Sequence, residues 1–404
     1  MPEPEDVLII HRVPYEKINY HEVIDHDAYA VHYILVKGKT DDVPDDIPHH
    51  VAVVSEANFI EDVLFYVHSV GLDVKNVVAL SEYNLISAEI IRNVLGLASR
   101  KPVYDVLKYR DKHIMKRHVA EAGVRCPQSA LLSNGAPQDL LETWVKIVFK
   151  PTAGAASENT HIFDSYTEFV QSDRVAAAIK SGARCLIEEY VAGDICHFDG
   201  LVSNGKIVVA IGSRYLGNCF DFTLGQPLAS VQMDDTSQYN EWIAKCLNAV
   251  GIANGAFHLE GILSGDEIVF LEVANRAGGA GVVTCTQLST GLNMMQEEVR
   301  MAMLGQDYKT PEITTKQDQF GWFVVPAATY QNGFDKETRF QGSPNIVSLN
   351  INASPQNIGG ISYAENNNPC TGIVRGNSSK TCVQTIDNIF GLATNTAATL
   401  GPRI

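Results

Sequence analysis

Short apolar runs alternate with a helical pattern through the first hundred residues. Runs rich in β-branched residues lie at 7–10, 31–36, 51–54 and 77–80, and each is typical of a strand. Residues 59–70, between the last two runs, repeat apolar side chains at helical spacing. Alternating strands and helices predict a parallel α/β sheet, and ligands of such sheets bind at the carboxyl ends of the strands.

The next part of the chain has the pattern of a second α/β unit. One or two helices are expected over 105–123, and a further helix is expected over 167–181. Strands are expected at 145–150 and 185–190, and the first of them runs into a turn of small residues at 152–159.

The pattern then changes to antiparallel strands. These are expected at 207–211, 255–263 and 267–273, and the last two are joined by a hairpin turn at Ser264-Gly265-Asp266. Residues 288–303 have the spacing of one amphipathic helix whose methionines fill the core. From about residue 310 the chain is rich in Asn, Gly, Thr and Ser with short β-like runs, which predicts a C-terminal lobe of short strands.

Composition and charge narrow the class of protein. The 404 residues, of which 45% are hydrophobic, can form a large core in more than one domain. A formal net charge of −16 argues against nucleic acid or an anionic membrane as a partner, although it could simply maintain solubility. No run of 18 apolar residues predicts a membrane span, and the acidic start lacks the features of a signal peptide. Eight scattered cysteines without a C-x-x-C pair favour reduced thiols in a cytoplasmic protein and argue against zinc.

Two common phosphate-binding motifs are missing from the sequence. It contains no G-x-x-x-x-G-K-[ST] loop and no G-x-G-x-x-G after the first strand, so neither a P-loop nor a dinucleotide fingerprint is present. Candidates for phosphate binding therefore have to be sought among other cationic residues.

Lysines in two blocks are such candidates. Lys112 and Lys116 lie one helical turn apart and share a face, although surface lysine pairs are common. Lys150 ends a buried strand without an obvious partner, where an ammonium group is costly to bury, so a bound anion would offset the cost. The small residues from Thr152 to Ser157 would let backbone amides approach that anion. The alternative is a lysine that reaches solvent past the sheet edge.

Carboxylates mark two further places. Glu260 and Glu272 are expected to face each other across the hairpin, where they would repel unless a divalent cation lay between them. Alternatively, they point to opposite faces, or Arg276 neutralises them. Glu82 follows the fourth strand and could pair with the ammonium group of a substrate, or it could be an ordinary solvated loop residue. A strand also emerges into Glu188 and the residues that follow, which could present backbone groups to adenine.

The ordered blocks R-D-K-x-x-M-K, F-K-P, E-E-Y-V-x-G, H-x-E and F-L-E-V-x-x-R-x-G-G resemble the ATP-grasp superfamily over about residues 75–305. The resemblance implies an α/β protein that binds ATP and Mg²⁺ between two α+β lobes. It predicts an N-terminal α/β domain, a first lobe, a second lobe with the metal site and a C-terminal β-rich lobe, at 1–104, 105–186, 187–309 and 310–404.

The resemblance also implies a role for each matching residue. Glu260 and Glu272 would hold Mg²⁺, and Arg276 would stabilise the transferred phosphoryl group, with Gly278 and Gly279 leaving open backbone for a substrate. The residues expected to bind ATP are Lys112, Lys150, Ser157, Glu188, Glu189, Tyr190, Val191 and Asp194. Among these, Glu188 would take the adenine amino group, while the backbone from Glu189 to Val191 would bond the ring.

Some positions depart from the common pattern of the superfamily. Ala274 stands where an Asn is frequent, and E-V-A-x-R-x-G-G is most similar to the branch of L-amino-acid ligases that form dipeptides. Asp194 would have to replace the usual ribose-binding glutamate, and Gly154 is the only glycine in the expected phosphate turn.

We therefore expect a ligase that activates a small carboxylic acid as an acyl phosphate and couples it to an amine, with an amino acid as the expected substrate. A carboxylase using bicarbonate is one alternative, and a non-catalytic ATP-binding module is another. Arg276 argues against the second, because nucleotide binding alone does not need a guanidinium at the phosphoryl end. A homodimer would be an ordinary assembly for such a protein.

Overall fold

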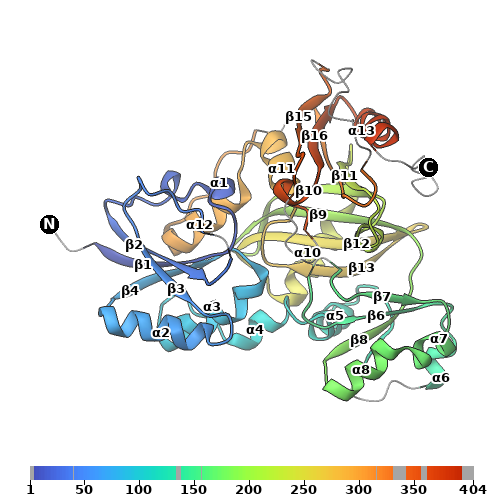
Figure 1. The fold of residues 1–404 in the computed structure, drawn as a ribbon, viewed down its shortest axis with the longest axis horizontal. Coiled ribbons are helices and arrows are strands. Elements are labelled where there is room, and N and C mark those ends of the chain that lie inside the picture. The colour runs from blue at the N-terminus through green and yellow to red at the C-terminus, as the bar shows by residue number, and fades with distance from the viewer. Residues whose placement is uncertain are drawn as a thin grey trace.

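The computed structural model describes residues 4–39, 41–132, 138–155, 157–314, 316–330, 343–355 and 362–393. Three sheets form the molecule (Figure 1). A parallel sheet lies at the N-terminal end, an eight-stranded sheet occupies the centre, and a small antiparallel sheet lies beside it. The expected α/β class is confirmed.

The N-terminal sheet is parallel, and its strand order is β3-β2-β1-β4. All four predicted strands are present: β1 (Glu5–His11), β2 (Tyr29–Val36), β3 (His50–Val54) and β4 (Val74–Ala79). Chain order reverses between β1 and β4, because β2 and β3 extend to one side of β1 and β4 lies on the other. The carboxyl ends of β1 and β4 therefore flank the crevice where such sheets bind ligands.

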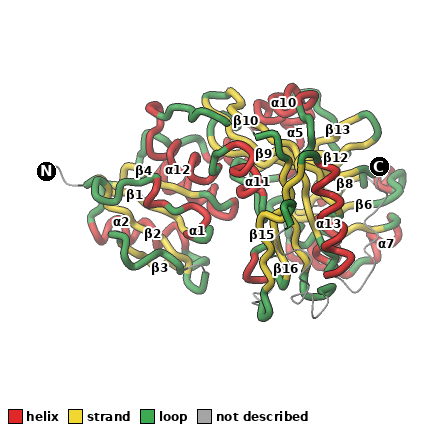
Figure 2. The backbone as a smooth tube through the Cα atoms, turned by 90° about the horizontal axis from the view of Figure 1, so that it is seen from above, coloured by secondary structure: helices red, strands yellow, loops and turns green. Residues whose placement is uncertain are grey.

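Helices cover both faces of this sheet. Leu8 and Ile10 face α2 (Phe59–Val70) and α3 (Leu85–Val94), whereas Val7 and Ile9 face the opposite side, as alternation along a strand requires. The opposite side is covered by the short α1 (Tyr15–Ile18) and by α12 (Met294–Leu304), which returns from much later in the chain. In Figure 2, α12 lies over the N-terminal sheet.

The small antiparallel sheet has the order β5-β8-β6-β7. Its strands are β5 (Ser129–Leu131), β6 (Ile147–Pro151), β7 (His161–Phe163) and β8 (Cys185–Glu189), and its helices are α6 (Gln138–Leu141), α7 (Tyr166–Gln171) and α8 (Asp173–Ser181). A single helix over 167–181 was expected and is wrong, because Ser172 adopts an extended backbone with ψ 124° between α7 and α8. Before this sheet, α4 (Val103–Leu107) and α5 (Lys112–Glu121) confirm the two-helix expectation.

The central sheet has the order β13-β12-β9-β10-β11-β14-β16-β15. Its strands are β9 (Asp194–Ser203), β10 (Lys206–Leu216), β11 (Leu228–Gln232), β12 (Gly255–Ser264), β13 (Glu267–Ala274), β14 (Gln319–Val325), β15 (Ile346–Ile351) and β16 (Cys370–Gly376). The helices associated with it are α9 (Cys219–Thr223), α10 (Asn240–Val250), α11 (Val282–Thr290) and α13 (Ser379–Ala393). The predicted hairpin at 264–266 joins β12 and β13.

One expectation about the later chain needs correction. Residues 288–303 do not form one helix, because Gly291 has φ 81° and ends α11, while the Asn293 side chain caps α12 by accepting from the amides of Met295 and Gln296. The C-terminal strands are present, but they extend the central sheet, and α13 packs on them. None of the helices in the described part of the chain has the length and apolar character needed to cross a bilayer.

Candidate active site

A cavity of about 1100 Å³ lies between the small sheet and the central sheet. Apolar side chains line it from both sides, with Val148 and Ile162 on the small sheet and Ile262 and Leu271 on the central one. Such a slot suits a flat apolar ring system. Every residue that the sequence assigned to ATP or to the metal lines this cavity: Lys112, Lys150, Ser157, Glu188, Glu189, Tyr190, Val191, Asp194, Glu260 and Glu272.

The two predicted metal ligands are direct cross-strand partners, Glu260 on β12 and Glu272 on β13. The Tyr215 hydroxyl donates to Glu260 Oε1 at 3.0 Å, and Lys112 Nζ lies 3.1 Å from Glu272 Oε2. Burial alone would raise the pKa of Glu272, but the charges of Lys112 and Lys150 outweigh it and hold this pKa at about 2. Two carboxylates on one wall of the cavity are the hard oxygen ligands that Mg²⁺ prefers, so the pair fits a divalent cation.

Lys150 and Lys116 share one buried carboxylate. Lys150 Nζ lies 2.7 Å from Glu188 Oε2, and Lys116 Nζ lies 3.0 Å from Glu188 Oε1. The expectation that Lys150 lacks a protein partner is therefore wrong, because β8 pairs with β6 and brings Glu188 beside it. Burial acts to raise the pKa of Glu188, but the charges of Lys116 and Lys150 lower it by more, so this pKa lies below its ordinary value. One carboxylate between two ammonium groups gives the cluster a net positive charge, which can attract a phosphate.

The segment after β8 is held at the rim of the cavity by its backbone. The amides of Glu189 and Tyr190 donate to the carbonyl oxygens of Gln128 and Lys146, at 3.0 and 3.2 Å. Arg125 Nη2 donates to Glu189 Oε1 at 2.7 Å, which directs that carboxylate away from Glu188. Glu189 therefore contributes to the cavity through its main chain.

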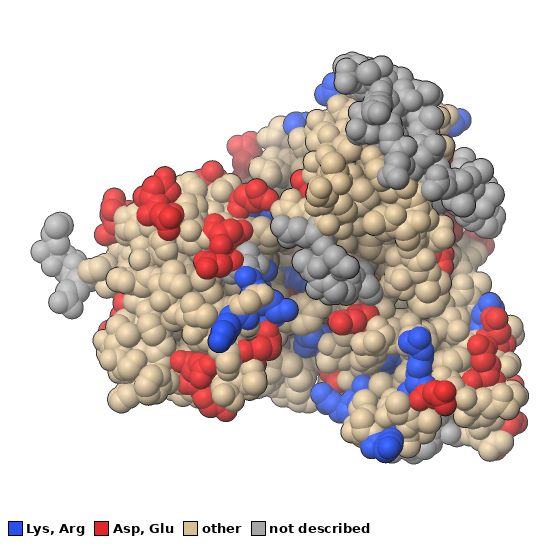
Figure 3. Space-filling model, in the orientation of Figure 1, with Lys and Arg blue, Asp and Glu red and all other residues tan. Residues whose placement is uncertain are grey.

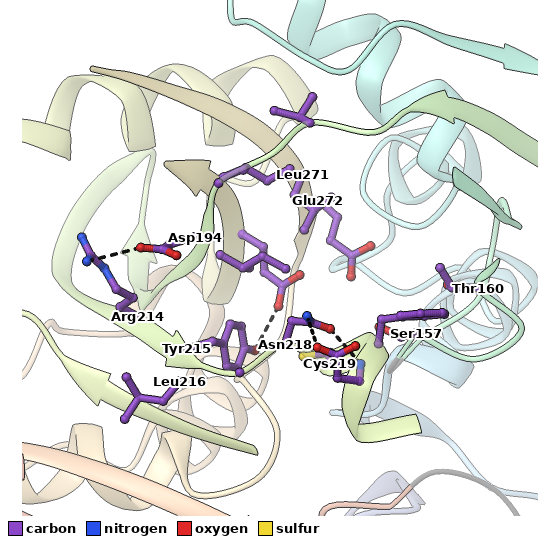
Figure 4. Close-up of a pocket in the computed structure, with 18 of the residues that line it drawn as sticks. Ser157, Thr160, Asp194, Arg214, Tyr215, Leu216, Asn218, Cys219, Leu271 and Glu272 are labelled. Atoms are coloured by element: carbon purple, nitrogen blue, oxygen red, sulfur yellow. Dashed lines mark hydrogen bonds and ion pairs between the residues drawn. The ribbon is translucent and has the colours of Figure 1, made fainter. Parts of the chain in front are cut away.

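The turn of small residues after β6 is fastened to α5. Lys112 donates through Nζ to the Gly154 carbonyl oxygen at 2.6 Å and through its amide to the Thr152 carbonyl oxygen at 2.8 Å. Ser157, which has φ 56°, lies across the cavity from Asp194 in Figure 4. Asp194 already has a partner, because Arg214 Nη1 lies 3.5 Å from its carboxylate. A ribose contact by Asp194 stays a prediction.

Arg276 and Glu82 lie together, outside the set of residues that line the cavity. Arg276 donates to Glu82 Oε2 through Nε at 2.9 Å and through Nη2 at 2.6 Å, and Arg110 Nη1 lies 3.4 Å from Glu82 Oε1. The Glu82 carboxylate is thus engaged by two guanidinium groups, whereas the sequence suggested an ammonium partner. Gly278 and Gly279 follow Arg276 in the same loop, and Gly278 lies next to the buried Asp199.

The sequence did not reveal a buried polar chain behind Glu260. Asp199 on β9 accepts from His197 Nδ1 at 2.5 Å and from His258 Nδ1 at 2.7 Å, and His258 Nε2 lies 3.3 Å from Glu260 Oε1. Burial lowers the pKa of His258, but Asp199 outweighs it and raises this pKa to about 10. The alternation of His197 and Asp199 on one face of an otherwise apolar strand was the available signal. Asp199 fixes the orientation of His258 and, through it, supports Glu260.

The C-terminal helix also reaches the cavity, which no local pattern predicted. Ser379, Lys380, Val383 and Gln384 on α13 contribute to its lining. They lie more than one hundred residues after Glu272 in the sequence, so only the pairing of β11 with β14 and of β14 with β16 brings them there.

Comparison with solved structures gives full-length matches. The L-amino acid ligase of Bacillus licheniformis superposes with a TM-score of 0.70 at 17% identity, covering 96% of this chain and 98% of that one. The N5-carboxyaminoimidazole synthetase of Staphylococcus aureus, solved with ADP, gives 0.66 at 12% identity, covering 96% and 97%. The biotin carboxylase domain of the Hydrogenobacter thermophilus 2-oxoglutarate carboxylase, solved with MgADP and bicarbonate, gives 0.65 at 14% identity, covering 95% and 89%. The sequence matches no protein-family model and no curated protein.

Proposed function

We propose that this chain, which has the fold of the ATP-grasp ligases, is an ATP-dependent carboxylate–amine ligase. The observation that carries the proposal is the cross-strand pair Glu260 and Glu272 in a cavity that is also lined by the buried lysines Lys112 and Lys150. Opposed carboxylates and clustered ammonium groups are the parts that a metal-bound triphosphate requires. An amino acid is the substrate that the E-V-A-x-R-x-G-G pattern favours.

The proposed reaction has two steps. A substrate carboxylate attacks the γ-phosphorus of ATP and ADP leaves, and an amine then displaces phosphate from the acyl phosphate to give an amide. Glu260 and Glu272 would hold Mg²⁺, which shields the negative charge of the phosphates when bound. Lys112 and Lys150 would hold the phosphates, the small-residue turn with Ser157 would cover them, and Arg276 would meet the charge that develops during phosphoryl transfer.

The remaining residues of the proposed ATP site would bind the adenine and the ribose. Glu188 pairs with Lys150 and Lys116 and would take the adenine amino group, while Tyr190 and Val191 line the same cavity. Asp194 would face the ribose. Gly278 and Gly279 would leave room for the substrate beside Arg276.

A carboxylase that uses bicarbonate is the second candidate function. The same fold, at TM-scores of 0.65 and 0.66, supports a biotin carboxylase domain and a carboxyaminoimidazole synthetase. Both candidates need the ATP site described above, and they differ in the acid that is phosphorylated.

The cysteines support a reducing location such as the cytoplasm. All eight are free, and six of them are buried. Disulfides form and persist in oxidising compartments and are rare where thiols are kept reduced, so free cysteines favour a reducing compartment.

An ADP-release assay with amino acids, singly and in pairs, tests the proposal. ADP formation should require Mg²⁺ and an amino acid, and it should proceed in bicarbonate-depleted buffer. Glu272→Gln should abolish turnover, whereas Glu267→Gln, on the exposed start of the same strand, should leave it intact. Turnover that depends on bicarbonate instead would favour the carboxylase. Full activity of Glu272→Gln would remove the metal assignment.

A further inference from the structure

Four elements bring charged side chains to the crevice between β1 and β4. Arg12 follows β1, and Glu82 and Tyr83 lie in the 3-10 turn Glu82–Asn84 that follows β4. Arg110 precedes α5, and Arg276 follows β13. Figure 3 shows basic side chains gathered in the hollow between the N-terminal sheet and the rest of the molecule. This is the place where a reversal of strand order predicts a ligand site.

The contacts leave one guanidinium group poorly matched. Arg110 and Arg276 bind the two oxygens of Glu82, a side chain that is 11% exposed. Arg12 forms an ion pair with the exposed Glu56 through Nη2, and its Nε is buried with no hydrogen-bond partner among the described residues. An ion pair with an exposed carboxylate stabilises little, and an unpaired buried donor costs stability. Of the three guanidinium groups, Arg12 is therefore the one whose carboxylate partner lies largely in water.

The Tyr83 ring connects Arg12 to this group. The guanidinium carbons of Arg12 and Arg110 each lie 6.0 Å from the ring centroid, which is cation–π distance. Tyr83 is 54% exposed, so its ring presents an accessible surface between the two arginines. A planar anion lying beside it would reach both guanidinium groups.

We propose that this crevice selects an acid substrate that carries a second anionic group, a carboxylate or a phosphate. The inference rests on the proposed ligase function and specifies its substrate. The carboxyl group to be activated lies on the Arg276 side, which is the side of Glu272. The second anion binds between Arg12 and Arg110, where it can accept hydrogen bonds from the guanidinium N–H groups.

An ammonium site at Glu82 fits these contacts less well. Each Glu82 oxygen already accepts from a guanidinium, and an approaching ammonium group would add a fourth positive charge to the three arginines. Repulsion by those charges disfavours a cation and favours an anion at this place.

Matched pairs of amino acids that differ by one anionic group provide the test. The kcat/KM for ADP release is measured with glutamate against glutamine, aspartate against asparagine, and phosphoserine against serine. The wild type should prefer a charged member by about tenfold or more, the factor that one additional charge-assisted contact supports. The carboxylate pairs and the phosphate pair separate the two kinds of anion.

Arg12→Gln should remove most of that preference, and Arg12→Lys, which keeps the charge, should retain part of it. Arg117→Gln, at an exposed arginine on α5, is the control and should keep the wild-type preference. Equal kcat/KM for charged and uncharged members in the wild type would overturn the inference even if Arg12→Gln does not fold. An unchanged preference in folded Arg12→Gln would also overturn it.

Binding without turnover distinguishes failure of this inference from failure of the ligase function. The thermal shift produced by each amino acid alone is measured for the wild type and for Arg12→Gln. If no acid supports ADP release, the ligase function fails, and a larger shift with the charged members that depends on Arg12 still supports an anion site. If ADP is released but the charged members give no larger shift and no higher kcat/KM, the ligase function stands and the inference fails.

Discussion

Lys150 forms an ion pair with Glu188 and is also proposed to bind phosphate, and melting with and without nucleotide can separate these two roles. It neutralises Glu188 within the folded protein, and in the proposed complex it meets the phosphates. Lys150→Met keeps the aliphatic volume but removes the charge. It should lower the melting temperature, because breaking a buried ion pair costs on the order of 3–5 kcal/mol.

The stabilisation by Mg·ATP should shrink in the same variant, because tighter binding to the native state raises apparent stability. Melting temperatures with and without nucleotide measure this. Lys146→Met, at the exposed lysine just before β6, should melt like the wild type with and without nucleotide. A full-sized nucleotide shift in Lys150→Met would mean that Lys150 serves only Glu188.

Arg276 is proposed to act on the developing phosphoryl charge. Its guanidinium makes two contacts to Glu82 at once, through Nε and Nη2, and a lysine cannot reproduce that planar geometry. Arg276→Lys should lower kcat by about a hundredfold or more while the KM for ATP changes little. A near-normal kcat with a lowered melting temperature would restrict Arg276 to holding Glu82.

Glu298 makes stability depend on pH in a direction that can be checked. Burial raises its pKa from the ordinary 4.5 to about 8, although the Ala277 amide and the Arg276 charge oppose the shift. The folded protein then binds a proton that the unfolded chain has released, so stability falls as the pH rises from 4.5 through 8. The fall is on the order of 1.4 kcal/mol per pH unit. Glu298→Gln should flatten this part of the profile in urea titrations, and an unchanged slope would contradict the assignment.

The site residues differ in how visible they are in the sequence. Glu260 and Glu272 could be placed near each other because one short turn joins their strands. The register shift between Glu260 and Gly261, without which Glu260 would face Leu271, makes them direct partners and had no signal in the sequence. Contacts between Lys150 and Glu188, or between Arg276 and Glu82, depend on how separate elements meet. Local sequence patterns carry no information about which residues of separate elements come into contact. For the same reason they did not predict that Asp199 lies behind Glu260.

At the scale of elements, the loop after β13 connects Glu272, a proposed metal ligand, to Arg276 and the proposed substrate side. Gly278 and Gly279 in this loop make a matched pair, because a Cβ at Gly278 would lie 2.5 Å from Asp199 Oδ1, whereas one at Gly279 would meet nothing within 4 Å. Gly278→Ala should displace Asp199 and destabilise the fold by about 1–3 kcal/mol, as overpacking does. Gly279→Ala should retain wild-type stability.

Urea midpoints of the two glycine variants, measured side by side, check this expectation. Equal midpoints for Gly278→Ala and Gly279→Ala would show that the loop yields easily and that Asp199 is not packed against it. A loss confined to the KM for the acid in Gly279→Ala would support its place beside the substrate.

Periodicity located most elements, and short breaks explain the errors. The four strands of the N-terminal sheet are rich in apolar β-branched residues, so their runs are plain in the sequence, although Val51 and Val53 on the edge strand β3 are exposed. The break at Ser172 and the turn at Gly291 are one to three residues long, and the helical spacing continues across them. Strand β9 was missed because His197 and Asp199 interrupt its apolar pattern.

At the scale of the whole molecule, parts of the chain that are distant in sequence complete the N-terminal and central sheets. The N-terminal sheet is closed by α12, and the central sheet is completed by β14, β15 and β16. A β-rich C-terminal segment was expected, but its pairing with β11 is non-local and has no local signature. The four proposed domain bounds therefore remain predictions.

The central claim is that this protein phosphorylates a carboxylate. An oxygen of the acid must then leave with the phosphate, since the amine displaces phosphate at the acyl carbon. The most direct measurement supplies Mg·ATP with a mixture of amino acids whose carboxylates carry ¹⁸O, in unlabelled water without bicarbonate, and determines the mass of the released phosphate. The account predicts one ¹⁸O in each phosphate. Phosphate whose new oxygen comes only from water would identify an ATPase and contradict the claim.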